Sequence, residues 1–326
     1  MGRLEELRIN AYLSEVARGY GNNAFIADAL FPTIESELEK IDIFQFNKEA
    51  FQLYDTERAI RANSNVISPK GFSKHTATLT EHDLAYPIDY REEEESKKVK
   101  LQVHATNVVT EGLKLKHEKL CADLAQNPAN YSTNNKIALS GTSQLSKYGS
   151  DPIGLIDTAK DAICSNIGQD PNTMVIGQDV WARIKRHPQL KNMISDNQNK
   201  ILTLQLLKDF FEIENIVIGK SIFADKNNNF IRVWGNNIVL AYVPKLTART
   251  EYDPAYGYTV RKKNALQIDE YQKEGNKVKY IRATDIYTPF LVGAEAGYLI
   301  SNVINPNDAS YDVQKEAIEG AKNDGN

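Results

Sequence analysis

Residues 26–51 have the sequence IADALFPTIESELEKIDIFQFNKEAF, which places much apolar surface near the start of the chain. The stretch begins like a short helix, turns at Pro32 and continues as a strand with aromatic residues at Phe44, Phe46 and Phe51. Alternation of apolar and polar residues is the pattern of a strand with one buried face. Because no compact domain precedes this surface, we expect part of it to be covered by something other than the chain's own core.

A long strand–loop–strand excursion is predicted from residue 42 to residue 90. Alternating residue types mark both strands, and the Pro-Lys-Gly at 69–71 marks the loop between them. Few large aliphatic residues share one face, and an isolated hairpin is only marginally stable in water. The excursion is therefore expected to lie on its parent domain or on another molecule.

One long helix is predicted over residues 97–126. The acidic block REEEESKK at 91–98 suits a helix start, where the helix dipole favours negative charge. Apolar residues then recur at helical spacing until Asn127-Pro128 ends the pattern. The apolar stripe is narrow, so we expect the helix to lie on a sheet and not at the centre of a bundle.

The chain between residues 172 and 243 alternates between strand and helix patterns, and Pro at the first position starts a helix at 151–168 ahead of it. We expect a compact α/β unit with its own core, including Trp181 and Trp234. Its predicted elements are a strand at 173–177, helices at 178–194 and 201–211, a strand at 213–218 and a hairpin at 230–243. A second hairpin is predicted at 274–276, between strands at 258–271 and 277–288, and AGYLISNVI is a last strand.

Composition and charge exclude several classes of protein. The formal net charge is −4, whereas a protein that grips nucleic acid through its phosphates normally carries a basic excess. No apolar run approaches the roughly 20 residues of a membrane span, and the charged N-terminus does not resemble a signal peptide. Cys121 and Cys164 form no CxxC pair and are expected to be buried thiols in a reducing compartment, which indicates a cytoplasmic product.

No constellation of residues supports catalysis. The five histidines lack metal-ligand spacing, and the carboxylates Glu92–Glu95 sit at an exposed helix start where none is desolvated. Gly-Lys-Ser at 219–221 follows a predicted strand, but the first glycine of a phosphate loop is replaced by Glu214. We expect no enzymatic activity, cofactor or metal. A nucleotide-dependent α/β enzyme over 170–250 stays open as an alternative that rests on 219–221 alone.

Three stretches carry a resemblance to a known family. They are ADALFP in the opening stretch, the pair TERAIRANSNVIS and FSKHTATLTEHDLAYPID, and the closing segment from PAYGYTV to AGYLISNVI. In this order the chain resembles the major capsid proteins of tailed bacteriophages (Caudoviricetes) with the Hong Kong 97-like fold, over most of residues 12–304. The resemblance implies an α+β fold and a structural virion protein. Such a protein self-assembles into pentamers and hexamers of an icosahedral head around double-stranded DNA. An encapsulin-like compartment of the same fold is the alternative.

The resemblance also implies a layout and a set of contacts. The expected parts are an N-terminal arm (1–41), an extended β loop (42–95), a peripheral domain (96–169), an axial domain at capsomer centres (170–250), return strands of the peripheral domain (251–304) and a C-terminal tail (305–326). Arm and loop residues are expected to contact neighbouring subunits, with packing on their own peripheral domain as the alternative. These residues are Phe25, Leu30, Phe31, Phe44, Phe46 and Phe72.

Expected partners follow from the same resemblance. The arm begins almost at Met1, so we expect a separate scaffolding protein and not a fused scaffolding domain. A portal protein and non-specific proximity to packaged DNA are also expected, without a membrane, and a decoration protein is left open. Assembly is expected in the host bacterial cytoplasm. Lys70 and Lys74 lie in the loop, but no partner Asn or catalytic Glu is identified, so covalent crosslinking is not predicted.

Overall fold

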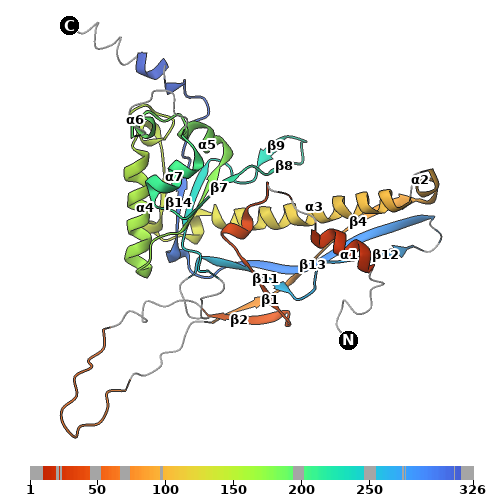
Figure 1. Ribbon diagram of the computed structural model, residues 1–326, viewed down its shortest axis with the longest axis horizontal. Coiled ribbons are helices and arrows are strands. Elements are labelled where there is room, and N and C mark those ends of the chain that lie inside the picture. Colours follow the sequence, from red (N-terminus) through yellow and green to blue (C-terminus); the bar gives the residue numbers. More distant parts are fainter. Residues whose placement is uncertain are drawn as a thin grey trace.

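Two five-stranded sheets organise the described part of the chain, and one long helix serves both (Figure 1). The computed structural model describes residues 10–19, 22, 24–44, 53–66, 74–95, 98–193, 202–245, 255–273, 275, 277–311 and 313–316. Two short ribbons, β2–β3 and β8–β9, stand beside the sheets.

The first sheet, which we call the long sheet, is built around its longest strand. Its strands are β1 (Thr33–Ser36), β4 (Thr80–Asp89), β11 (Gly257–Lys262), β12 (Gln267–Gln272) and β13 (Val278–Leu291). β13 pairs antiparallel with β4 along one edge and with β11 and β12 along the other. β1 extends the sheet by pairing parallel to β11.

The helix α3 (Lys98–Ala125) lies on the long sheet, which confirms the helix predicted over 97–126 and its placement. Its 28 residues give a rod of about 42 Å. The short helix α1 (Ala11–Gly19) packs beside it, and α2 (Tyr90–Glu95) precedes it. Their shared apolar cluster contains Leu13, Ala17, Ile88, Ala105, Val109, Leu113, Ile268, Ile281 and Ala283.

The second sheet, which we call the α/β sheet, has the strand order β5-β14-β10-β6-β7. Its strands are β5 (Lys136–Ala138), β6 (Thr173–Gly177), β7 (Asn215–Gly219), β10 (Asn237–Ala241) and β14 (Gly297–Ser301). Its helices are α4 (Pro152–Ile167), α5 (Gln178–Ile184), α6 (Pro188–Met193) and α7 (Leu204–Phe211). Short 3-10 turns occupy Ala27–Ala29, Pro128–Asn130, Thr133–Asn135, Gly141–Ser143 and Ala294–Ala296.

The sequence predicted that residues 172–243 would have a core of their own. The core of the α/β sheet instead includes residues from outside this range. Leu30 and Phe31 from the opening stretch join it, and so do Cys121 and Ala125 from the C-terminal end of α3. Trp234 is buried in this core as expected, and Trp181 is partly buried against it. The long helix therefore packs on one sheet at its start and enters the core of the other at its end.

Two predictions about the α/β sheet are wrong. The helix expected over 178–194 is two helices, because Pro188 cannot continue a helix that ends at Ile184 and instead begins α6. The hairpin expected at 230–243 does not form. β9 (Phe230–Arg232) pairs with β8 (Ile222–Ala224), whereas β10 lies between β14 and β6. Gly235, at φ 53, turns the chain from one sheet to the other.

The closing strands follow the prediction more closely. β12 and β13 form the antiparallel hairpin predicted around 274–276, and β14 is the predicted last strand. The strand predicted over 258–271 is divided into β11 and β12 by a turn at Asn264, whose φ is 56. Both β11 and β12 still pair with the same edge of β13, so the division does not change the predicted strand partner.

The predicted excursion is anchored at its base. β2 (Lys40–Phe44) pairs antiparallel with β3 (Lys74–Thr78), and after Leu79 the chain continues into β4 of the long sheet. Between these strands the described segment 53–66 projects away from both sheets (Figure 1). The base of the excursion therefore lies on its parent domain, and residues 53–66 do not lie on either sheet of the described part of the chain.

Neither a membrane span nor a metal site is found where the structure is described. None of the helices there combines the length and apolarity that crossing a bilayer requires. The same residues contain no group of three or more His, Cys, Asp or Glu side chains placed to hold a metal ion.

Gly219→Ala is expected to destabilise the chain. The added methyl group would lie 2.4 Å from the buried ring of Trp234, and overpacking of a core costs about 1–3 kcal/mol. Denaturant unfolding followed by tryptophan fluorescence measures the loss. Gly149→Ala is the control, because nothing lies within 4 Å of a methyl group added there. Equal unfolding midpoints for the two variants would contradict the close packing.

Candidate functional site

The opening stretch crosses the long helix at a buried carboxylate. Glu118 of α3 is 1% exposed, and its Oε2 accepts the backbone N–H groups of Ile26 at 3.0 Å and Ala27 at 2.8 Å. Its Oε1 accepts the indole N–H of Trp234 at 2.5 Å and the hydroxyl of Ser221 at 3.2 Å. A single side chain therefore joins the arm, the long helix and the α/β unit. We call this junction the arm seam.

The charge state of Glu118 is set by opposing effects. Burial raises the pKa of the Glu118 carboxyl above its ordinary value, and the hydrogen bonds from Trp234, the two arm amides and Ser221 oppose that shift. A buried carboxylate is costly unless its oxygens accept several hydrogen bonds. Four donors converge on this one, so removing one of its oxygens leaves buried N–H groups without an acceptor.

The arm residues expected at a subunit interface lie in different places. Leu30 and Phe31 are 0% exposed, and the Phe31 ring packs 5.5 Å from that of Tyr256, so their own chain already covers them. This corrects the expected neighbour contact for these two: both face the core of the α/β sheet. Phe25 is half-buried. The backbone of Phe44 belongs to β2, but its side chain lies outside the described residues, as do Phe46 and Phe72 entirely.

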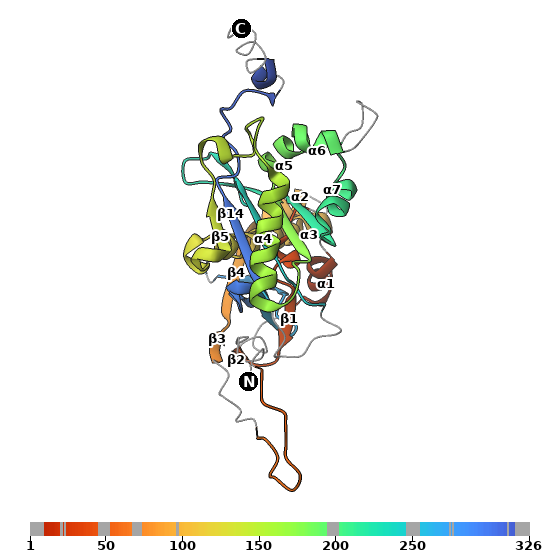
Figure 2. The same ribbon diagram turned by 90° about the vertical axis from the view of Figure 1, so that its left-hand side faces the viewer.

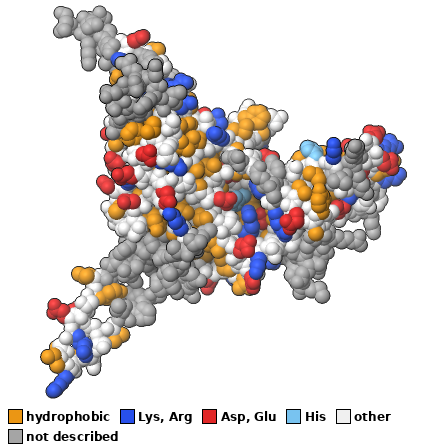
Figure 3. Space-filling view, viewed as in Figure 1, with side chains coloured by type: hydrophobic (Ala, Val, Ile, Leu, Met, Phe, Trp, Pro, Cys, Tyr) orange, Lys and Arg blue, Asp and Glu red, His pale blue; other side chains and the backbone are white. Residues whose placement is uncertain are grey.

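The projecting loop, residues 53–66, exposes aliphatic side chains that the sequence-based choice missed. Leu53 is 97% exposed, Ile60 is 94% exposed and Val66 is 88% exposed. Isolated aliphatic residues in a mostly polar loop were the available signal, but they lack the periodicity that marks an apolar face. Figure 3 shows this segment as a separate projection in which hydrophobic, acidic and basic side chains alternate.

Hydrogen bonds give the projecting loop a shape of its own. The Asn65 amide donates to the carbonyls of Asp55 at 2.9 Å and Glu57 at 3.0 Å. The Arg58 guanidinium donates to the carbonyl of Ala62 at 2.7 Å. These bonds close the loop on itself, so its exposed apolar side chains are presented in a defined arrangement.

A second exposed apolar surface lies on the β8–β9 ribbon. Phe230 is 78% exposed, and Ile222 and Ile231 are 46% and 42% exposed. Figure 3 shows hydrophobic side chains gathered on the projection above the middle of the molecule, where Figure 1 places this ribbon. This surface was missed by the sequence-based prediction, because the hairpin predicted at 230–243 would pair Phe230 with the apolar strand at the other end of that segment.

A buried polar cluster lies between α3 and the long sheet. His117 Nε2 is 2.8 Å from the hydroxyl oxygen of Thr259, and the His117 ring stands edge-on to Tyr287. On the same tyrosine, His82 stacks at 4.4 Å. Burial lowers the pKa of His117 to about 4; the charge of Asp28 opposes this shift, and Arg261 adds to it. The imidazole is therefore neutral in the folded chain near neutral pH.

The Gly-Lys-Ser segment at 219–221 has a packing role. Gly219 lies against the ring of Trp234, and the Ser221 hydroxyl is buried and donates to Glu118. A phosphate loop needs open backbone amides at this position. Here the indole covers the glycine, so the segment belongs to the arm seam.

Glu118→Gln is expected to lower the free energy of unfolding by about 1–3 kcal/mol for each buried donor left unpaired. The new NH₂ group would face N–H donors where an oxygen accepted them. Chemical denaturation measures the loss, and hydrogen exchange at the Ile26 and Ala27 amides should accelerate. Glu37→Gln removes the same charge from a side chain that is 82% exposed and should stay within about 0.5 kcal/mol of the wild type. Unchanged exchange in Glu118→Gln would contradict the seam.

The depressed pKa of His117 predicts that the folded chain loses stability in acid. Its folded pKa is depressed, so the unfolded chain binds a proton between about pH 6.5 and about pH 4 that the folded chain refuses. Stability is full above pH 6.5 and falls below it by about 1.4 kcal/mol per pH unit. His117→Gln should lack this part of the slope. Parallel curves of unfolding free energy against pH for wild type and variant would refute the assignment.

Comparison with known proteins now identifies the family. Residues 63–284 match the family described as phage major capsid protein E. The major capsid protein of Burkholderia phage BcepMu is 48% identical over 307 residues, covering 93% of this chain and 99% of that protein.

Solved structures agree with the predicted Hong Kong 97-like fold. A phage-related protein from Bordetella bronchiseptica RB50 is 29% identical with a TM-score of 0.77, covering 92% of this chain and 99% of that one. The mature capsid of bacteriophage PhiM1 shares the fold at 12% identity and a TM-score of 0.53, with 87% and 88% covered. The chain therefore belongs to the phage major capsid protein E family.

Proposed function

We propose that this chain is the shell subunit of a tailed-phage head, assembling into pentamers and hexamers that enclose double-stranded DNA. The observation that carries the assembly mechanism is the projecting loop, whose Leu53 and Ile60 are almost fully exposed in the single chain. Burying such side chains is favourable by about 1.5–3 kcal/mol each. Closed symmetry repeats the same contact around the shell, so modest individual contacts add to a stable particle.

The proposed layout assigns the two sheets to two parts of the subunit. The long sheet with α3 would form the peripheral domain, with the arm (1–41) and the extended loop (42–95) reaching neighbours. The α/β sheet would form the axial domain at capsomer centres. Its boundary is wider than 170–250, because β5 and β14 complete the sheet and Leu30 and Phe31 fill its core.

The proposed partners are other copies of this chain, a separate scaffolding protein and a portal protein. Assembly would take place in the host bacterial cytoplasm, and the mature location is the virion. An encapsulin-like compartment is not favoured, because the relative that is 48% identical over nearly the whole chain is a phage capsid protein. Particles that contain DNA support the head, and particles that contain an enzyme support the compartment.

Replacing Leu53 and Ile60 together by Ser is expected to weaken each contact by about 3 kcal/mol or more, because two buried apolar side chains are lost. The assembled fraction near the midpoint of assembly should therefore fall about a hundredfold or more. Both side chains are exposed in the monomer, so its unfolding midpoint should not change. Electron microscopy and sedimentation of protein under assembly conditions measure the fraction. Asn63→Ser, an exposed polar change in the same loop, is the control.

Two outcomes would count against different parts of the proposal. A wild-type chain that stays monomeric under all assembly conditions, with scaffold supplied, sinks the shell function. A Leu53/Ile60 variant that assembles like wild type leaves the shell function intact and removes the loop from its mechanism.

A further inference from the structure

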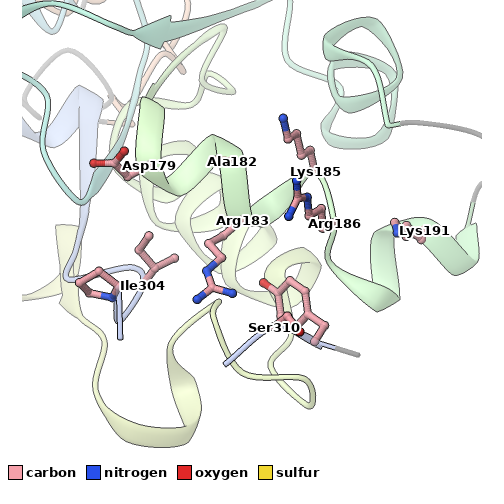
Figure 4. Close-up of a pocket in the computed structure, with 10 residues that line it drawn as sticks. Asp179, Ala182, Arg183, Lys185, Arg186, Lys191, Ile304 and Ser310 are labelled. Atoms are coloured by element: carbon pink, nitrogen blue, oxygen red, sulfur yellow. The ribbon is translucent and has the colours of Figure 1, made fainter. Parts of the chain in front are cut away.

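A basic pocket lies where α5, α6 and the segment from Ile304 to Tyr311 meet (Figure 4). It has a volume of about 400 Å³. Four cationic side chains and one acidic side chain line it: Arg183, Lys185, Arg186, Lys191 and Asp179. Its other walls include Ile304, Pro306 and Tyr311.

The charges of the pocket are only partly neutralised within the chain. Asp179 is paired with Arg232, 3.0 Å away on β9, and Arg183 donates to the carbonyls of Asp308 and Ala309. Among the described residues, none forms an ion pair with Lys185, Arg186 or Lys191. The pocket therefore presents three uncompensated positive charges beside an apolar wall, where an anionic group would be held more strongly than in open water.

A face of opposite charge lies on α4 of the same α/β unit. Asp157 and Asp161 are exposed one helical turn apart, and Asp170 is exposed just beyond the helix. Lys160 does not offset them, because its ammonium group donates to the Phe211 carbonyl at 2.9 Å and lies 3.4 Å from Glu212. Like charges at this spacing destabilise a helix slightly, so a cationic neighbour would relieve them. Acidic side chains gather along this margin in Figure 3.

The two charged faces look in different directions. In Figure 2, α4 faces the viewer, while α5 and α6 lie above it and to its right. Both are packed on one sheet, so they cannot turn toward each other within a single chain. Two different complementary patches on one subunit make a heterologous contact, which closes into a ring when the rotation per subunit divides a full turn.

We propose that the basic pocket at α5–α6 receives the acidic face of α4 from a second copy of this chain, joining α/β units head to tail around a capsomer. The inference rests on the proposed shell function and names the contact that sets the register of the ring. Charge pairs of this kind fix orientation and suppress wrong contacts more than they add affinity.

The other exposed acidic block fits the pocket less well. At α2, Glu93 accepts a hydrogen bond from the Gln102 side chain and lies 3.9 Å from Lys279, and Arg91 adds a positive charge beside it. This end of the molecule therefore carries both signs, whereas the exposed acids of α4 have no free cation beside them among the described residues.

Charge reversal in pairs tests the contact. Arg186→Glu with Lys191→Glu, and separately Asp157→Lys with Asp161→Lys, should each cut the capsomer fraction at least about tenfold at 0.1 M salt. The variant that carries all four changes should recover assembly to within about twofold of wild type, because the reversed faces attract again. Sedimentation velocity gives the fraction, and unfolding midpoints establish that each monomer folds.

Controls and contrary outcomes separate this contact from the shell function itself. Lys100→Glu with Lys273→Glu reverses two exposed cations outside both contact surfaces and should assemble normally. Normal assembly of either reversed pair, or no recovery in the combined variant, overturns the proposal while wild-type shells still form. A pocket variant that assembles but retains less DNA would assign the cations to phosphate and also overturn it. Failure of the wild type to assemble rejects the shell function instead.

Discussion

The carboxylate of Glu118 is the point on which the arrangement of the chain depends. Its donors come from the arm at Ile26 and Ala27 and from the α/β unit at Ser221 and Trp234, while Glu118 itself belongs to the long helix. A buried charge without these donors would be too costly to keep, and the donors without the charge would be orphaned. Each part therefore fixes the position of the other two.

The long helix turns that local junction into a molecular frame. Ala105 and Val109 pack on the long sheet, and Cys121 and Ala125 lie in the core of the α/β sheet, with Glu118 between the two contacts. Both sheets are thereby fastened to one rod. Among the described residues, the most exposed aliphatic side chains lie on the projecting loop, and the β8–β9 ribbon exposes Phe230.

Local patterns predicted the elements better than their partners. The helical spacing of apolar residues was enough for α3, and proline at the first helical position was enough for α4. The strand β10, buried from Ile238 to Ala241, was given the wrong neighbour, because an unbroken apolar run does not say which strand lies beside it. The resemblance to capsid proteins supplied the order of the parts, but not which arm residues were already covered.

The arm seam could not be predicted from the spacing of residues in the sequence. Glu118 lies 92 residues from Ile26, 103 from Ser221 and 116 from Trp234, so no short motif contains it. In the sequence it is an ordinary glutamate on a helix with a narrow apolar stripe. Phe31 was assigned to neighbours for a similar reason: its partner Tyr256 stands more than two hundred positions further along the chain.

The pairing of β4 with β13 also orders events in time. Thr80 pairs with Tyr287 and Asp89 with Val278, so the base of the projecting loop is joined to a strand made near the end of translation. Contacts between such distant segments form slowly, because a long loop must close first. During synthesis, the projecting loop is therefore translated long before β13, the strand that β4 pairs with at the base of the loop. The long sheet is complete only when almost all of the chain has left the ribosome, because β13 ends at Leu291 of 326 residues.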